Sequence, residues 1–447
     1  MAAFTVDIDE CRSAWTDDKP HYRPEPALAS AIEADVAIVG GGFTGVSTAL
    51  HLARRFPERR VALLEARQLA NGASGRNGGM VLNWVNGVEH DDPARARRIY
   101  DVTRSGIDLI EDTIARYHLA AGFRRDGCLE VFTDPARAAA AATQAEWLQA
   151  AGIPIRFLDS AELAATLRIE GAAGALFDPH AAQLDGVAYL RALRPVLQAL
   201  GVTVYEDTPV LSVREGAECR LATPGGEVRA KAIVLATNAY TPRLGYFTGG
   251  ILPLHSHVIA TEPVSAARWA EVGWRGVAGF SDDLDRIAYA SLTRSGPDGA
   301  GRLVFGGGSN ASYGYQYGGK TTWAGPADTG FAAVEARMRR YLPGAADIRV
   351  TSRWTGPVAV TLSRVCTMGV RGEHRNVYFA LGYSGHGVTL ANLAGRVLTD
   401  IYSGDDVGWR DLPFYQQRLL WIPPDPMRWM GYHAYTSMTG RSPRRRL

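Results

Sequence analysis

The sequence predicts an α/β protein in which two domains are woven through each other, one with a parallel sheet and one with a mixed sheet. Three observations lead to this prediction. A strand–helix–strand unit occupies residues 35–65. Short apolar runs that are typical of buried parallel strands occur in three separated blocks, at residues 35–64, 202–236 and 377–380. Residues 251–345 contain alternating aromatic stretches that are typical of antiparallel strands.

The composition excludes several classes of protein. The chain has 447 residues, 46% hydrophobic and 21% charged, as in globular proteins long enough for two domains. The net charge of +2 gives no reason to expect a nucleic-acid partner. The four cysteines are scattered and have no metal-ligand spacing, so we expect free thiols, no metal site and a cytoplasmic location. There is no uninterrupted apolar run of about 18 residues, so no transmembrane segment is expected.

The first functional motif is the glycine-rich turn after the first strand. Gly40 permits a tight turn, Gly42 leaves room for a pyrophosphate, and Gly45 lets the next helix pack closely on the strand. That helix, expected over residues 46–55, would point its N-terminal N–H groups at the phosphates. Glu65, at the end of the second strand, stands where a carboxylate accepts ribose hydroxyls. Together these features predict a Rossmann-type dinucleotide-binding domain.

A second glycine-rich stretch, residues 71–79, follows Glu65 closely. Its sequence NGASGRNGG suits a backbone that lies against a flat ligand and hydrogen-bonds it. NAD needs no second glycine-rich segment at this point, whereas the longer FAD does. We therefore expect FAD as the cofactor, and the alternative is a flexible surface loop.

The remaining elements follow in chain order. Residues 1–33 form an arm, in which three prolines argue against regular structure. Further strands are expected at Cys128–Phe132, Val202–Tyr205, Ala232–Ala236 and Val377–Ala380, and further helices over Gly186–Leu200 and Thr389–Ser403. The expected FAD-binding domain takes residues 34–90, 176–245 and 346–404, the substrate domain residues 91–175 and 246–345, and a C-terminal extension residues 405–447.

Four segments resemble the D-amino-acid-oxidase superfamily of flavoproteins: DVAIVGGGFTGVSTALHLA, LLEARQLANGASGRNGGMV, LPLHSHVIATEP and YFALGYSGHGVTLANLAGRVL. They stand in the family's order and span residues 34–404. Within the superfamily they are most similar to the branch of gamma-glutamylputrescine oxidoreductases and sarcosine or glycine oxidase-like enzymes. The resemblance implies a Rossmann-type FAD-binding domain interleaved with a mixed-sheet α+β substrate domain. It also implies oxidation of an amine to an imine, which water then hydrolyses.

The resemblance assigns a set of residues to the cofactor. In chain order, the expected FAD contacts are Gly40, Gly42, Phe43, Thr44, Gly45, Glu65, Ala66, Ser74, Asn77, Gly78, Gly79, Met80, Val210, Ala236, Thr237, Gly385, His386, Gly387, Val388 and Thr389. The last five would meet the pyrimidine edge of the flavin ring. A helix that begins there would stabilise the anion formed on reduction.

Three residues around that helix start, Tyr383, His386 and Thr389, are the candidates for catalysis. The alternative for His386 is a packed, hydrogen-bonding side chain. Thr389 stands where sarcosine-oxidase-like relatives place a lysine that binds the substrate carboxylate. Relatives with covalent FAD carry a cysteine where this chain has Gly356 or Pro357, so noncovalent FAD is expected. Their lysine for reaction with O2 would fall near residue 304, where no lysine is close in sequence; the electron acceptor is therefore O2 or another carrier.

The function that we hypothesise is hydride transfer to flavin N5 from the carbon next to a neutral amine nitrogen. The candidates for contact with this small amine are His255, His257, Arg286, Tyr289, Trp354 and Tyr383. Two alternatives come from other classes. One is a flavoprotein hydroxylase or halogenase, although such enzymes carry a Gly-Asp pair where this chain has Gly-Tyr-Ser-Gly-His-Gly. The other is a non-catalytic, flavin-bearing assembly protein. The basic end, RSPRRRL, is expected to be solvated, with surface membrane contact as the alternative.

Overall fold

The protein is described by a computed structural model over residues 8–19, 21–89, 91–294, 299–325 and 328–439. Its first sheet has eight strands: β1 (Ile32–Val39), β2 (Val61–Leu64), β8 (Thr203–Tyr205), β9 (Ser212–Arg214), β10 (Cys219–Thr223), β11 (Gly226–Leu235), β18 (Thr367–Arg371) and β19 (Val377–Leu381). The order is β18-β19-β11-β1-β2-β8, and β10 pairs with β11 and β9. From β19 to β8 all neighbours are parallel. β1 lies between β11 and β2, so its second half is buried on both faces, as its apolar sequence predicts.

The second sheet is mixed and has nine strands: β4 (Cys128–Phe132), β5 (Arg156–Asp159), β6 (Gly174–Asp178), β12 (Leu252–Thr261), β13 (Gly279–Asp282), β14 (Ala288–Leu292), β15 (Leu303–Gly307), β16 (Tyr313–Tyr315) and β17 (Val350–Val360). Its order is β16-β12-β15-β14-β13-β4-β6-β5, with β17 on the other side of β12. A short pair of β3 (Met80–Val81) and β7 (Ala182–Gln183) stands apart from both sheets.

The helices are α1 (Ala14–Asp17), α2 (Phe43–Arg55), α3 (Pro93–Tyr117), α4 (Pro135–Ala150), α5 (Ser160–Thr166), α6 (Gly186–Ala199), α7 (Ala266–Val272), α8 (Asp328–Tyr341), α9 (Gly387–Ser403) and α10 (Met427–Thr439). α3 and α4 begin with the same N-cap arrangement. Asp92 and Asp134 accept N–H groups of the first turn, and a proline at the first helical position needs no acceptor. None of the helices in the described ranges is long and apolar enough to cross a membrane.

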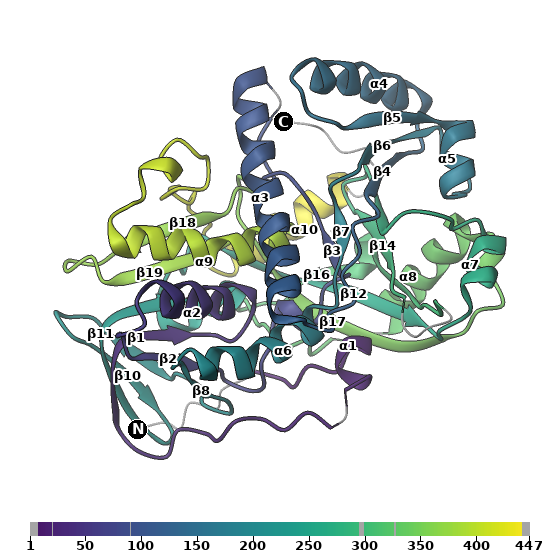
Figure 1. Ribbon diagram of the computed structural model, residues 1–447. Helices are drawn as coiled ribbons and strands as arrows, with labels where there is room; N and C mark the ends of the chain where they lie inside the picture. The colour runs from purple at the N-terminus through teal and green to yellow at the C-terminus, as the bar shows by residue number, and fades with distance from the viewer. Residues whose placement is uncertain (1–7, 20, 90, 295–298, 326–327, 440–447) are drawn as a thin grey trace.

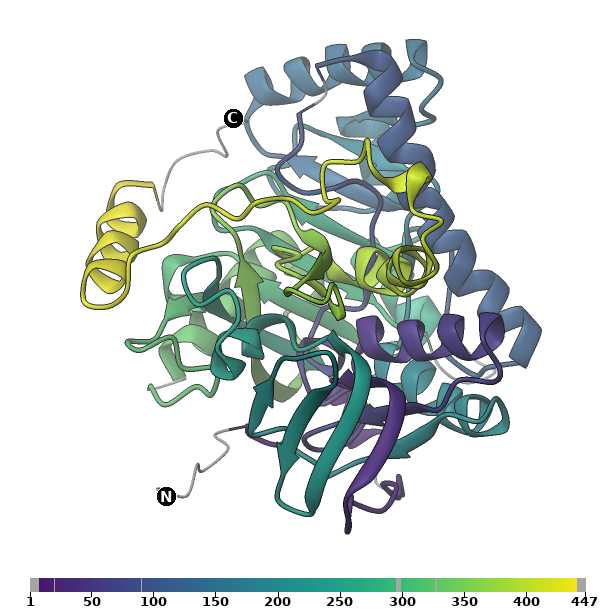
Figure 2. The ribbon, with the colours of Figure 1, turned by 90° about the vertical axis from the view of Figure 1, so that its left-hand side faces the viewer.

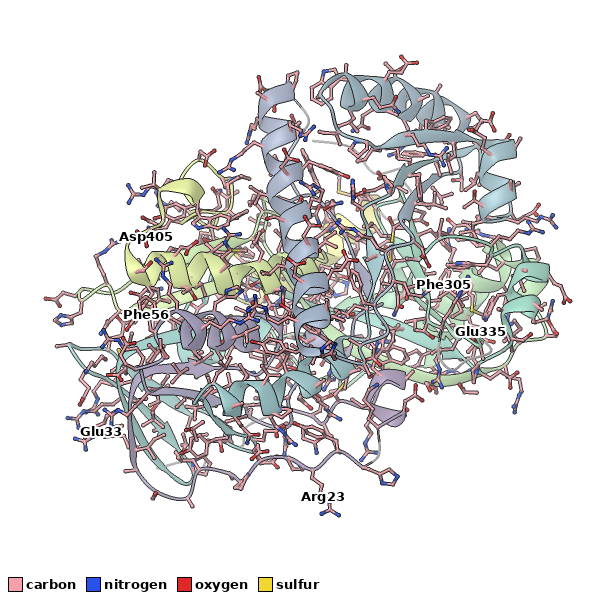
Figure 3. The ribbon with its side chains drawn as sticks, viewed as in Figure 1. Arg23, Glu33, Phe56, Phe305, Glu335 and Asp405 are labelled. Carbon is pink, nitrogen blue, oxygen red and sulfur yellow. The ribbon has the colours of Figure 1, made fainter. Side chains whose placement is uncertain are left out.

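Helices α2 and α9 lie side by side on one face of the first sheet (Figure 1) and touch where Ser47 Oγ donates to the Asn392 carbonyl. Both end at the outer side of the molecule. Figure 3 shows Phe56, which follows α2, and Asp405, which follows α9, near each other and on the opposite side from Phe305 of the second sheet. The two helices therefore begin in the interior, toward the second sheet.

The expected fold is confirmed, with three local differences. β17 pairs with β12 along nearly its whole length, so residues 350–360 belong to the second sheet, and the expected domain boundary at residue 346 is wrong for this strand. Its alternating burial is typical of a strand in such a sheet. The arm contains one helical turn, α1. The C-terminal extension contains α10, which projects at one edge in Figure 2. Residues 1–7 of the arm and the basic end, residues 440–447, lie outside the described residues.

Candidate functional site

One large cavity, about 2640 Å³ in volume, is lined by residues of both sheets. Small-molecule sites usually measure about 300–1,000 Å³, so this cavity has room for a dinucleotide and a substrate. Most of the predicted cofactor residues line it: Gly40, Gly42, Phe43, Thr44, Glu65, Ala66, Ser74, Asn77, Gly78, Met80, Val210, Ala236, Thr237, Gly385, His386, Gly387 and Val388. Gly45, Gly79 and Thr389 do not line the cavity.

The glycine turn has the geometry that the sequence predicts. Gly40 has a φ of +108°, and a Cβ there would lie 2.7 Å from the Ala236 carbonyl oxygen. A Cβ on Gly45 would lie 1.8 Å from the Gly40 carbonyl oxygen, so Gly45 serves the contact between helix and strand rather than the cavity. The N-cap residue of α2, Gly42, has no side chain to accept the N–H groups of the first turn, and of these the Phe43 N–H donates to Ser74 Oγ at 3.1 Å. This helix start can therefore bind an anion from the cavity.

Glu65 lies next to that turn and is 7% exposed. Its Oε2 accepts the Gly41 N–H at 2.6 Å, and its Oε1 accepts the Arg67 N–H at 3.0 Å. Burial raises the pKa of Glu65 to about 7, although backbone N–H groups favour its ionised form. Each carboxylate oxygen keeps a free lone-pair site, so Glu65 can still accept the two ribose hydroxyls expected of it.

The second glycine-rich stretch is held in place by the N-terminal arm. Trp15 Nε1 donates to the Asn77 carbonyl at 2.8 Å, and Ser13 Oγ donates to the Gly75 carbonyl at 2.6 Å. Arg76, a buried residue of this stretch, forms an ion pair with Asp9 of the arm at 3.0 Å. Sequence reasoning missed this role of the arm, because the arm has no periodic pattern and its partners lie about 60 residues away.

The helix start at α9 is the second polar feature of the cavity. Gly385 has a φ of +99°, which favours glycine, and His386 is the N-cap residue and caps no N–H group with its side chain. Gly385, His386, Gly387 and Val388 all line the cavity. Two helices from distant parts of the chain thus direct their positive N-terminal ends at one cavity.

The other two catalytic candidates use their hydroxyl groups elsewhere. The Tyr383 hydroxyl is bonded to Thr44 Oγ1 at 2.7 Å, so it joins the chain before α9 to the first turn of α2. Burial raises the pKa of Tyr383 well above its usual range, which keeps the phenol neutral. Thr389 Oγ1 donates to the Leu82 carbonyl at 2.7 Å.

The expected substrate contacts divide into two groups. Arg286 and Tyr289 line the cavity, as does Tyr383. His255, His257 and Trp354 do not: their ring nitrogens bond to the backbone of Lys320, Ser312 and Arg76. The two histidines are fully buried in β12, where alternation made them look available.

Sequence reasoning missed the contribution of α10, whose Tyr432 and Tyr435 line the cavity. The Arg286 guanidinium lies over the Tyr435 ring, 5.7 Å from its centroid. The aromatic residues of the extension were visible in the sequence, but nothing local connects them to a cavity whose other lining residues come from elements along most of the chain.

These residues fit FAD. The open start of α2 suits a diphosphate, Glu65 suits a ribose, and the open start of α9 suits the electron-rich edge of a flavin. Cys366, the cysteine nearest in sequence to the covalent position of relatives, is buried and does not line the cavity. Gly356 and Pro357 line it without offering a thiol, in keeping with noncovalent binding.

Comparisons with known proteins agree with this arrangement. The sequence profile of a family described as FAD dependent oxidoreductase (DAO) matches residues 35–401. The probable oxidoreductase OrdL of Haemophilus influenzae is 28% identical over 413 residues, which cover 89% of this chain and 89% of that protein. The gamma-glutamylputrescine oxidoreductase of Escherichia coli is 28% identical over 393 residues, covering 86% of this chain and 87% of that protein.

Among solved structures, glycine oxidase from Geobacillus kaustophilus superposes with a TM-score of 0.72 at 22% identity, covering 87% of this chain and 99% of that one. This likeness shows a shared fold. The family match extends over most of the chain and includes both helix starts and Glu65. The chain therefore belongs to the DAO family of FAD-dependent oxidoreductases and is an enzyme of the amine and amino-acid oxidoreductase type.

Proposed function

We propose that this enzyme oxidises the carbon–nitrogen bond of a small amine or amino acid to an imine, which water then hydrolyses. Bound FAD supplies the oxidant, because flavin N5 can accept a hydride from the carbon next to the nitrogen. The observation that carries the proposal is that α2 and α9 both begin at the wall of one cavity, and neither N-cap residue caps its helix with a side chain. One start suits the diphosphate, and the other suits the negative charge that a flavin gains on reduction.

The chain's own residues bind and orient. Glu65 and the α2 start hold the nucleotide, and the α9 start lies where the ring edge is expected. The rings of Tyr289, Tyr432 and Tyr435 provide an aromatic wall that attracts an ammonium group and excludes water. No strong base is required if the bound amine loses its proton before its C–H bond breaks.

Anaerobic reduction tests the proposal directly. The FAD-loaded protein is mixed with a broad panel of amines and amino acids without O2, and the flavin absorbance is followed. At least one member should bleach the flavin, while free FAD with the same compounds stays yellow. Bleaching by NADPH but by no amine would indicate the hydroxylase class instead. A flavin that no compound bleaches would contradict amine oxidation.

We propose His386 as the catalytic candidate, since it lines the cavity at the α9 start, and His386→Ala tests it. The variant removes the imidazole and leaves the α9 start open. If the imidazole moves a proton or orients the substrate, flavin reduction slows about 100-fold or more. A change smaller than about threefold, less than 1 kcal/mol of barrier, would assign the effect to the helix start alone.

The same experiment addresses the electron acceptor. The described ranges include all three lysines of the chain, Lys19, Lys231 and Lys320, and none lines the cavity. Admission of air to the bleached protein distinguishes O2 from another carrier by the rate at which colour returns. A cytoplasmic location is supported by the four cysteines, which are all free and buried.

A further inference from the structure

A polar cluster of two buried residues and one half-buried residue lies in the cavity wall, one residue beyond the Leu82 carbonyl that accepts Thr389 Oγ1 of α9. It consists of Asn83, which follows β3, Tyr100 on α3, and Asp178 at the end of β6. Asp178 Oδ1 accepts the Tyr100 hydroxyl at 2.9 Å, and Asp178 Oδ2 accepts Asn83 Nδ2 at 2.7 Å. Asn83 is 6% exposed and Tyr100 is 2% exposed, yet all three residues line the cavity.

The hydrogen bonds of this cluster leave acceptor sites without donors. A carboxylate can only accept hydrogen bonds. The Asn83 amide must therefore turn its Nδ2 toward Asp178, and the Tyr100 hydroxyl must donate its hydrogen bond to Asp178. Asn83 Oδ1 is then buried with no hydrogen-bond partner among the described residues. The Tyr100 oxygen and Asp178 Oδ2 also keep lone pairs. A buried acceptor without a donor is costly, which indicates that a ligand supplies the donor.

The cluster also carries a negative charge. Its hydrogen-bond donors are neutral, since the third one to Asp178 is the His180 backbone N–H at 2.9 Å. No arginine or lysine of the described ranges forms an ion pair with Asp178. The two arginines whose charge acts on Tyr100, Arg104 and Arg125, are each bound to other acids, both of them to Asp108.

Aromatic side chains complete the surroundings. Trp84 and Trp147 pack against the apolar cluster that contains Tyr100, and both line the cavity. Indole rings attract cations through their faces. Acceptor groups, a negative charge and indole rings all favour the same kind of ligand, a cation with several N–H donors.

We propose that Asn83, Tyr100 and Asp178 form a binding site for an ammonium group, and that the substrate carries this group in addition to the amine that is oxidised. This assignment rests on the proposed function and narrows its substrate class to diamines and related cationic amines. The reacting nitrogen must be neutral, whereas a neighbouring carboxylate favours the protonated form. The site therefore holds the nitrogen that is not oxidised.

The test compares diaminobutane with butylamine, which lacks the second nitrogen. Binding of each is measured by calorimetry on the FAD-loaded protein after reduction with dithionite, because the reduced enzyme cannot turn them over. Wild-type protein should bind diaminobutane about tenfold to hundredfold more tightly than butylamine. Asp178→Asn should remove this difference, since the new amide presents a donor to Asn83 and the Asn83 amide turns its own donor toward the cavity. Butylamine affinity should stay unchanged.

Two further variants are included. One tests the site if Asp178→Asn folds poorly, and the other is a control. Asn83→Leu removes the unpaired acceptor with little change of volume and should also weaken diaminobutane selectively. Asp112→Asn, an exposed substitution on α3 outside the cavity, makes the same chemical change and should alter neither affinity. FAD content and thermal unfolding confirm that each variant is loaded and folded.

Equal affinities of wild-type protein for the two amines would overturn the ammonium site. So would a loss of both affinities in Asp178→Asn with intact FAD content, because this would indicate a general structural role. If diaminobutane binds selectively but no amine bleaches the oxidised flavin, the ammonium site stands and the proposed oxidation falls.

Discussion

Cofactor affinity should depend on pH through Glu65. In the FAD-free protein this buried carboxyl has a pKa of about 7. Ribose hydroxyls bind an ionised carboxylate more strongly than a protonated one, so FAD binding favours ionised Glu65. Below about pH 7, binding must first remove the proton. For a pKa of about 7, the dissociation constant of FAD should rise about tenfold between pH 8 and pH 6.

Quenching of flavin fluorescence during titration of the FAD-free protein measures this dependence. His386, a second ionisable side chain, lines the same cavity. The contribution of Glu65 is therefore obtained by comparing the wild type with Glu65→Gln. The Gln variant should bind FAD more weakly at pH 8, by roughly tenfold or more for the lost charge-assisted bonds, and should show a flatter pH profile. A wild-type affinity that does not change between about pH 6 and pH 8 would refute the reasoning, as would the full slope in the Gln variant.

The same group links stability to pH. The carboxyl has a pKa of about 7 in the folded, FAD-free protein against 4.5 ordinarily, so between these values the folded protein binds more protons than the unfolded one. Its stabilising contribution is full at low pH and is lost as pH rises toward about 7, with a total of about 3 kcal/mol. Urea unfolding of the FAD-free protein should show this loss, and Glu65→Gln should lack it.

Three other substitutions test the framework around the cofactor. Gly395→Ala places a Cβ 2.2 Å from a side-chain oxygen of α2 and should lower the free energy of unfolding, measured by thermal unfolding, by about 1–3 kcal/mol. Gly408→Ala, where a Cβ has nothing within 4 Å, is the control and should be neutral. Equal stability of the two variants would contradict the close contact of α2 with α9. Trp15→Phe removes the arm's donor to the second glycine-rich stretch and should weaken FAD binding about fivefold, and unchanged affinity would mean that the arm is dispensable. Tyr383→Phe should cost about 1 kcal/mol by leaving the Thr44 hydroxyl unpaired, while a kcat lowered about 100-fold with normal stability would restore a catalytic role for the phenol.

The parts of the fold that local sequence determines were predictable. β1, β2 and β19 are short apolar runs buried within a parallel sheet, and Gly40 and Gly45 have contacts that no side chain could share. These features depend on burial and on close backbone contacts, which require apolar runs and glycines that can be read directly in the sequence.

Other parts depend on contacts that the sequence does not record. β17 joins the second sheet because β12, almost 100 residues earlier, offers an edge. His255 and His257 lie in a strand next to the cavity in sequence, yet each is buried and bonds one ring nitrogen to a backbone carbonyl of a later segment. The polar group at Asn83, Tyr100 and Asp178 comes from three separate elements, and no spacing rule connects them.

The two helix starts that share the cavity come from opposite ends of the chain, at Gly42 and His386. A nascent polypeptide on the ribosome exposes the first start long before the second is translated. It can therefore meet the nucleotide half of the cofactor early, but it cannot enclose the yellow ring until nearly all of the protein has been made. Visible colour should accordingly report completed synthesis, and fragments that stop before α9 should remain pale and susceptible to proteases.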